Sequence, residues 1–252
     1  FDLTGAPQGD IALPGVGTID EISGLEDAPD VWYAYASPLA PRTVYRFDPA
    51  TKKSEGFEVA KLPVDTSLFE TKALFATSTD GTRIPFFLTA KKGLPKDGSN
   101  PTMIYGYGGF SISMLPTYRQ DVPAWLEKGG VWVTANMRGG AEYGEAWHKA
   151  GMLENKQRVF DDFIAVAEQL VKDKYTSPAR LGIMGGSNGG LLVGAAMTQR
   201  PDLYKAVVCA VPLLDMLRYH LYGSGKTWVP EYGSAEDPAQ FKALHGYSPY
   251  RR

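Results

Sequence analysis

The pattern of hydrophobic and polar positions divides the chain into two parts. Residues 1 to about 70 contain short apolar runs, such as 31–35 and 42–48, which are separated by clusters of Pro, Gly and Asp. Runs of this length and spacing predict β-strands, and no helical period of useful length occurs among them. They suit one blade of a β-propeller or part of a β-sandwich, with a small β-appendage as the alternative.

From about residue 71 the period changes, and apolar runs of strand length alternate with helical segments. Residues 72–78 and 83–90 are joined through Asp80-Gly81, which favours a hairpin. In the segment 156–172 a helical period places these apolar residues on one side: Val159, Phe160, Phe163, Ile164, Ala167, Leu170 and Val171. Further strand-like runs lie at residues 102–105, 131–136, 180–184 and 206–211. The alternation predicts an α/β fold with a largely parallel sheet.

A Gly-rich turn between the strand at 180–184 and a helical run at 188–199 is the strongest functional motif. Its sequence, Gly185-x-Ser187-x-Gly189, is that of a nucleophile elbow, in which a strand turns abruptly into a helix and presents a serine hydroxyl above the sheet. The glycines allow the two backbones to approach without Cβ clashes. In this context the motif predicts that Ser187 is the nucleophile of a hydrolase with the α/β-hydrolase fold.

A serine nucleophile also needs hydrogen-bond donors for the oxyanion. We expect the backbone amide of Asn188, directly after the nucleophile, to be one donor. Tyr107 lies in a Gly-rich loop after the strand at 102–105, and we expect it to supply the second. A plain tight turn is the alternative interpretation of that loop.

The proton of the serine must pass to a base, which an acid orients. In the α/β-hydrolase fold the chain order is Ser, acid, His. Of the three histidines, His148 precedes Ser187, His220 follows it by only one strand, and His245 is typical of a surface residue. We therefore expect none of the three to be the base.

Composition and charge narrow the class of protein. The chain has 252 residues, of which 44% are hydrophobic, with a formal net charge of −2. It therefore offers a substantial core but no basic field for nucleic acid or an anionic membrane, and we expect a soluble protein that binds neither. The single cysteine, Cys209, lies in an apolar run and is expected to be a small buried hydrophobe. We expect no metal ion and no cofactor.

Several motifs in the second part together resemble the prolyl oligopeptidase family. They are collinear and lie at residues 105–110, 135–145, 147–149, 185–190 and 199–203. The resemblance covers residues 70 to about 250. It implies a β-propeller that caps an α/β-hydrolase domain and admits short peptides, which are cleaved after proline. Residues 1–70 would then be the last blade of the propeller, and residues 71–252 a catalytic domain that is incomplete at its C-terminal end.

The resemblance also implies roles for single residues. The nucleophile is matched by Ser187, and the oxyanion donors by Tyr107 and the amide of Asn188. The proline pocket is matched by Trp228, Phe110, Tyr232 and Leu213. An indole face such as that of Trp228 suits a flat pyrrolidine ring. Leu213 departs from the pattern, because the family often has a smaller aliphatic residue there.

In the family the acid and the histidine of the triad follow well after this tryptophan. We therefore expect a truncated chain that lacks both groups and is nearly inactive by itself. The parent activity expected is that of a serine endopeptidase, which cleaves short peptides on the C-terminal side of proline through an acyl-enzyme. The alternatives are an oligopeptidase of basic-residue specificity, an esterase of the same fold, and a non-enzymatic α/β-hydrolase-like binding protein. The expected partners are short proline-containing peptides, and we expect a monomer when full length, in the cytoplasm or alternatively in the periplasm.

Overall fold

The first part of the chain forms a small antiparallel sheet in the computed structural model, which describes residue 1 and residues 4–252. The strands follow one another in space as they do in sequence: β1 (Thr18–Gly24), β2 (Val31–Ser37), β3 (Ala40–Asp48) and β4 (Lys53–Phe57). The ring of Tyr33 stacks on that of Tyr45 across β2 and β3, with centroids 5.3 Å apart. The predicted short strands are confirmed, and a meander of four strands is the form of one propeller blade.

The second part forms a six-stranded sheet. Its strands are β5 (Phe69–Thr77), β6 (Arg83–Lys91), β7 (Thr102–Tyr105), β8 (Val131–Ala135), β9 (Leu181–Gly186) and β10 (Ala206–Ala210). They lie in the order β10-β9-β7-β8-β6-β5. The four strands from β10 to β8 are parallel, whereas β6 and β5 are antiparallel to their neighbours. The predicted, largely parallel sheet is therefore confirmed, as is the hairpin through Asp80-Gly81.

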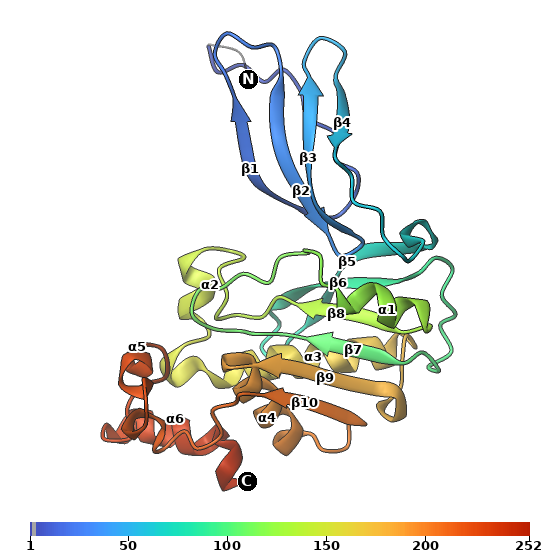
Figure 1. Cartoon of the computed structure of the whole chain (residues 1–252). Helices are drawn as coiled ribbons and strands as arrows, with labels where there is room; N and C mark the ends of the chain where they lie inside the picture. Colours follow the sequence, from blue (N-terminus) through green and yellow to red (C-terminus); the bar gives the residue numbers. More distant parts are fainter. Residues whose placement is uncertain (2–3) are drawn as a thin grey trace.

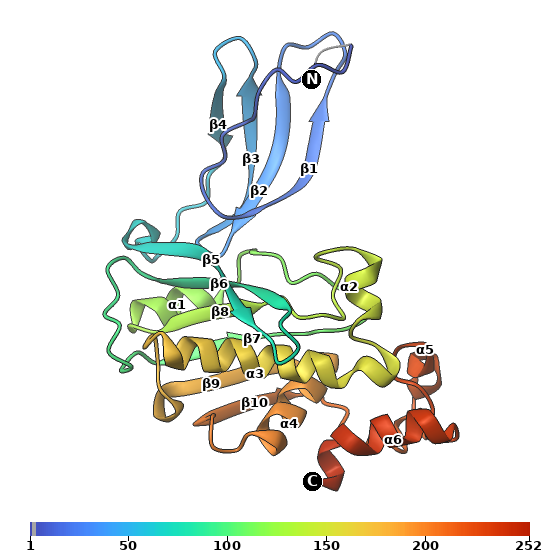
Figure 2. The same ribbon diagram turned by 180° about the vertical axis from the view of Figure 1, so that it is seen from behind.

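Helices cover both faces of this sheet (Figures 1 and 2). The main ones are α1 (Asp121–Glu127), α3 (Gln157–Lys172) and α4 (Asn188–Gln199), and each connects two parallel strands. Helix α1 packs on one face, and α3 and α4 pack on the other. The apolar side of α3 includes Val159, Phe160 and Phe163, all fully buried. Amphipathic helices of this kind hold the sheet between two hydrophobic layers.

Short helices complete the chain: α2 (Glu145–Lys149), α5 (Val229–Tyr232) and α6 (Pro238–Tyr247). The change from the first sheet to the second falls between Phe57 and Phe69, close to the expected boundary at residue 70. The division of the chain into two domains there stays a prediction. Cys209 is only half-buried, not buried as expected, because it lies on the edge strand β10.

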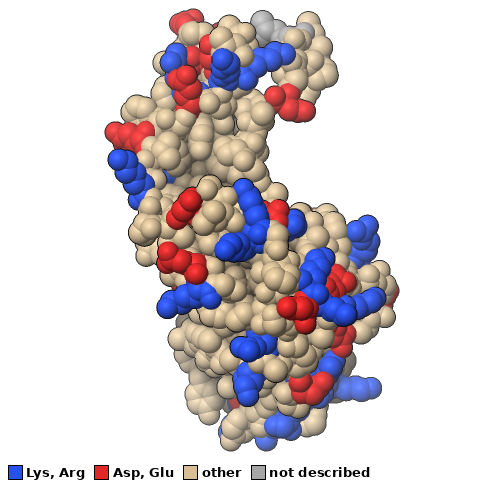
Figure 3. Space-filling view, turned by 90° about the vertical axis from the view of Figure 1, so that its right-hand side faces the viewer, with Lys and Arg blue, Asp and Glu red and all other residues tan. Residues whose placement is uncertain are grey.

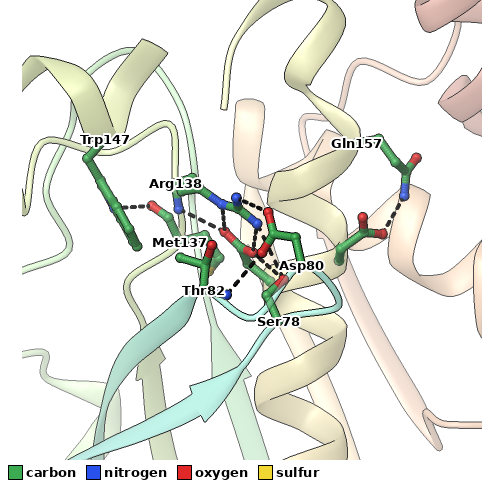
Figure 4. A network of polar contacts seen from close by, with 9 residues as sticks. Ser78, Asp80, Thr82, Met137, Arg138, Trp147 and Gln157 are labelled. Atoms are coloured by element: carbon green, nitrogen blue, oxygen red, sulfur yellow. Dashed lines mark hydrogen bonds and ion pairs between the residues drawn. The ribbon is translucent and has the colours of Figure 1, made fainter. Parts of the chain in front are cut away.

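A buried ion-pair network joins the loop after β8 to α3 and to the β5–β6 hairpin (Figure 4). The guanidinium of Arg138 lies 2.6 Å from the carboxylate of Asp162 and 2.5 Å from that of Asp80. Ser78 donates a further hydrogen bond of 2.6 Å to Asp162. The side chain of Arg138 is 5% exposed and that of Asp162 is inaccessible, so removing one partner would leave an uncompensated buried charge. The network therefore fixes the loop after β8 on the sheet.

On the face shown in Figure 3, basic and acidic side chains are interspersed over both sheets. Among residue 1 and residues 4–252, no helix is both long enough and apolar enough to cross a bilayer.

Candidate active site

Ser187 occupies the sharp turn between β9 and α4. Its backbone has φ 58° and ψ −118°, a combination that is strained for a residue with a Cβ. Its N–H donates a 3.0 Å hydrogen bond to the carbonyl of Ala210, at the end of β10. The residue is exposed. The structure thus gives Ser187 the geometry of a nucleophile elbow, with its side chain accessible to a ligand.

The elbow depends on two close backbone approaches. A Cβ on Gly185 would lie 2.1 Å from the carbonyl oxygen of Gly189 in the first turn of α4. A Cβ on Gly189 would lie 2.6 Å from the carbonyl oxygen of Gly106, in the loop after β7. Both distances are far below van der Waals contact, so only glycine fits at either position.

The strand register brings the loop that carries Tyr107 to Ser187. Tyr105 pairs with Met184 in the parallel β7–β9 ladder, so both strands end at the same edge of the sheet. The phenol of Tyr107 lies close enough to Ser187 to interact with its side chain. Burial raises the pKa of Tyr107, and the negative charge of Glu231 adds to this, against the lowering effect of the interaction with Ser187. Tyr107 therefore keeps its proton at neutral pH and can act as a donor.

Asn188 is the first residue of α4, so its backbone N–H has no carbonyl partner within the helix. Asn188 directly follows Ser187, and the role of its N–H as an oxyanion donor stays a prediction. The buried side chain has a second task that the sequence analysis did not predict. Its Nδ2 donates to the carbonyl of Tyr107 at 2.5 Å, and its Oδ1 accepts from the hydroxyl of Tyr232 at 2.8 Å. Asn188 therefore links the elbow to two other segments.

A cavity of about 470 Å³ lies beyond the end of β10. Val211 lines it. This residue follows Ala210, whose carbonyl accepts the N–H of Ser187. Trp228 and Leu213, two of the expected pocket residues, line it. Asp215 and Arg218 line it as well, and they pair with each other at 2.5 Å.

The other two expected pocket residues pack against each other at one side of this cavity. The rings of Phe110 and Tyr232 meet edge to face at 5.5 Å, and Tyr232 meets Tyr219, a cavity-lining residue, at 5.4 Å. Phe110 is half-buried, whereas Tyr232 is only 1% exposed, since its hydroxyl points inward to Asn188. Within the described residues Tyr232 therefore supports the site and offers a ligand almost no surface.

Three charged or titratable residues that the sequence analysis did not assign to the site lie directly behind it. The carboxylate of Glu231 accepts from the backbone N–H of Phe110 at 2.9 Å and from Nε2 of His148 at 2.7 Å. The ammonium of Lys156 donates to the carbonyl of Gly108 at 2.8 Å. Glu231 is 121 residues from Phe110 and 83 from His148, so no local spacing could indicate these contacts.

The histidines have other partners than Ser187. His148 binds Glu231, His220 lies 3.7 Å from a carboxylate oxygen of Glu236, and His245 stacks on Phe241. No hydrogen bond joins any of them to Ser187 within residue 1 and residues 4–252. The same residues hold no cluster of three His, Cys, Asp or Glu side chains suited to a metal ion. The exposed position of His245 agrees with its interpretation as a surface residue.

Comparison with known families decides the relationship. Residues 116–252 match the model of the prolyl oligopeptidase family. The chain belongs to the prolyl oligopeptidase family. Residues 1–60 match the N-terminal β-propeller domain of prolyl oligopeptidase, so the expected fold class, a partial α/β-hydrolase preceded by propeller strands, is confirmed.

Relatives within the prolyl oligopeptidase family align along almost the whole chain. The prolyl endopeptidase of Elizabethkingia miricola is 43% identical over 250 residues, which are 99% of this chain and 36% of the relative. The prolyl endopeptidase of Dictyostelium discoideum is 41% identical over 256 residues, covering 99% of this chain and 33% of the relative. The chain thus spans about a third of the length of the curated relatives that it matches.

Two solved structures agree in fold. One comes from a structural and mechanistic study of two prolyl endopeptidases; it is 55% identical with a TM-score of 0.89, and the match covers 99% of this chain and 37% of that one. The other is a post-proline cleaving enzyme from Rickettsia typhi, 41% identical with a TM-score of 0.84, and the match covers 93% of this chain and 34% of that one.

Proposed function

We propose that this chain supplies the nucleophile, the oxyanion donors and part of the proline pocket of a serine endopeptidase that cleaves short peptides after proline. One observation carries the proposal: an exposed Ser187 in an elbow, the phenol of Tyr107 near it and the cavity lined by Trp228 lie at one edge of the sheet. The family membership and the names of the relatives support the same activity.

The proposed reaction has two steps. Ser187 Oγ attacks the carbonyl carbon after which the chain is cut, and the phenol of Tyr107 and the amide of Asn188 donate to the oxyanion. The C–N bond then breaks, the leaving amine takes up a proton, and a serine ester remains. Water hydrolyses the ester, which releases the peptide acid and restores the hydroxyl.

The base that takes the serine proton is, in this proposal, a residue other than the three histidines of the chain. Support comes from their contacts, since each has another partner and none reaches Ser187. The 252-residue chain by itself is then nearly inactive. Loss of the base in a serine protease lowers kcat on the order of 10⁶-fold, and binding and oxyanion donors retain only a small residual rate.

A chromogenic Gly-Pro substrate tests the activity. The complete gene product should cleave it, Ser187→Ala should abolish cleavage, and Ser54→Ala, on the small sheet, should leave it unchanged. The 252-residue chain should show a rate at least about a thousandfold lower than the complete product. Comparable rates for the two, both lost in Ser187→Ala, would show that the base is among these 252 residues.

Basic-residue specificity is the second candidate, because one carboxylate, that of Asp215, lines the cavity. The pairing of Asp215 with Arg218 argues against basic-residue specificity, since the negative charge of Asp215 is already neutralised. Parallel assays with Gly-Pro and Gly-Arg substrates decide between the two, and faster cleavage after Arg would overturn the proposal. A fluorophosphonate probe that fails to label Ser187 in the complete gene product would instead favour a non-enzymatic binding protein.

A further inference from the structure

Glu231 lies where three separate segments of the chain meet behind the candidate site. It belongs to α5 (Val229–Tyr232), the short helix that begins directly after Trp228. Trp228 lines the cavity. One carboxylate oxygen accepts from the backbone N–H of Phe110, in the loop after β7, and the other from His148 in α2. The residue is 5% exposed.

The third segment contributes Lys156, which precedes α3. Its side chain is 1% exposed, its ammonium donates to the carbonyl of Gly108, and it lies 3.9 Å from Glu231. Gly108 and Phe110 stand on either side of Gly109, so one ion pair holds two peptide groups of the same loop. A buried ion pair seldom adds net stability over an apolar pair, and such pairs persist where they fix one particular arrangement.

The loop that is held carries the proposed oxyanion donor. Tyr107 is adjacent to Gly108, and its carbonyl accepts from Asn188. Phe110 takes a left-handed φ of 58°, a conformation that a non-glycine residue keeps only under external support. The hydrogen bond from Phe110 N–H to Glu231 is such a support.

We infer that Glu231 is a positioning residue, which ties the loop at 106–110 to α5 so that Tyr107 stays aimed at Ser187 while Trp228 stays at the cavity. This inference rests on the proposed function for its catalytic consequence but not for its geometry. Besides burial, the groups that shift the pKa of Tyr107 are Ser187, Glu231 and Tyr105. Those that face Glu231 are His148, Lys156 and the amide of Phe110.

Kinetics of the complete gene product on the Gly-Pro substrate test the catalytic consequence. Glu231→Ala should lower kcat about tenfold or more and change KM less than about threefold, because displacement of a catalytic group by about 1 Å costs up to a hundredfold in rate. Glu231→Gln keeps an acceptor for the amide of Phe110 and should retain kcat within about threefold.

A double-mutant cycle separates positioning from a general loss of structure. Tyr107→Phe alone should lower kcat on the order of a hundredfold, as for the loss of one oxyanion donor. In the Tyr107→Phe background, Glu231→Ala should then have an effect of less than about threefold. Glu142→Ala is the matched control, since Glu142 accepts the backbone N–H of Met114 in a different loop, and its effect should be the same in both backgrounds. Full additivity of Glu231→Ala and Tyr107→Phe would overturn the inference.

A spectroscopic measurement on the 252-residue chain needs no activity. Tyrosines labelled with ¹³C at Cζ report phenol ionisation, and the resonance that disappears in Tyr107→Phe belongs to Tyr107. Glu231→Gln should lower the pKa of Tyr107 because the carboxylate charge is removed, and Glu142→Gln should not. An unchanged pKa would overturn the inference that Glu231 acts on Tyr107. If the pKa shifts in the 252-residue chain but the complete product does not cleave after proline, the positioning stands and the proposed function is refuted.

Discussion

At the scale of single residues, the features that control the site are buried polar groups with distant partners. Lys156 is the extreme case, since its ammonium is fully buried between a backbone carbonyl and Glu231. Burial lowers the pKa of Lys156 to about 8, and Glu231 opposes only part of this shift. The protonation of one internal lysine is therefore coupled to folding.

This coupling predicts how stability depends on pH. Between about pH 8 and pH 10 the unfolded chain keeps the proton of Lys156, whose ordinary pKa is 10.5, and the folded chain releases it. The unfolded state then binds more protons, so the contribution of Lys156 to the free energy of unfolding rises with pH by up to about 1.4 kcal/mol per pH unit.

Urea unfolding at pH 7.5, 8.5 and 9.5 checks this prediction. The free energy of unfolding of the wild type minus that of Lys156→Met should increase with pH. Lys242→Met, at an exposed lysine, is the control and should show no such trend. A difference that stays flat for Lys156→Met would show that the buried lysine keeps its proton throughout this range.

Sequence reasoning assigned the residues with local motifs and missed those without. The place of Ser187 and Asn188 in the elbow could be predicted because the motif puts both within one turn. Glu231 and Lys156 carry no such signal, because their partners lie far away in sequence and meet them only in the folded chain. Tyr232 matched a family position, but its buried hydroxyl bond to Asn188 could not be read from the sequence.

At the scale of elements, the elbow and its helix are determined almost entirely by local sequence. The helix predicted at 188–199 is α4 (Asn188–Gln199), and the strand predicted at 102–105 is β7 (Thr102–Tyr105). The glycines explain this agreement, because β9 and α4 can pack this closely only where Cβ atoms are absent.

Alanine at Gly185 should therefore force β9 and α4 apart. We expect Gly185→Ala to lower the free energy of unfolding by about 1–3 kcal/mol, the usual cost of overpacking. Gly246→Ala is the matched control, since Gly246 lies in α6 with no atom within 4 Å of an added Cβ, and it should raise stability by about 0.5–1 kcal/mol. Urea unfolding of both variants gives the comparison, and equal stabilities for the two would contradict this explanation of the elbow.

At the scale of the whole molecule, the six-stranded sheet leaves one strand edge without a partner. β10 is the last strand in the order and pairs only with β9 among the described residues. Val208 on this strand is 41% exposed, and Val211 just beyond it is 80% exposed. An unpaired edge that carries apolar side chains is a site of association between chains.

We therefore expect the 252-residue chain to self-associate through β10 as its concentration rises. Val208→Lys should weaken this association about tenfold or more, because a charged side chain would have to be buried against a second copy. Leu25→Lys, at an equally apolar exposed position in the turn after β1, should not weaken it. Sedimentation velocity over a range of concentrations measures the effect, and equal association of both variants would rule out the β10 edge.

The sequence by itself determined the elements and their kind, because hydrophobic period and glycine placement act over a few residues. It also predicted Ser187 as the nucleophile, since the elbow is a local motif. Only the tertiary structure decided which groups surround Ser187, since β7, β9 and β10 must first align in parallel before the loops after them meet. It alone brought Glu231 to Phe110, His148 and Lys156, because burying a charge requires partners that only a folded chain can assemble.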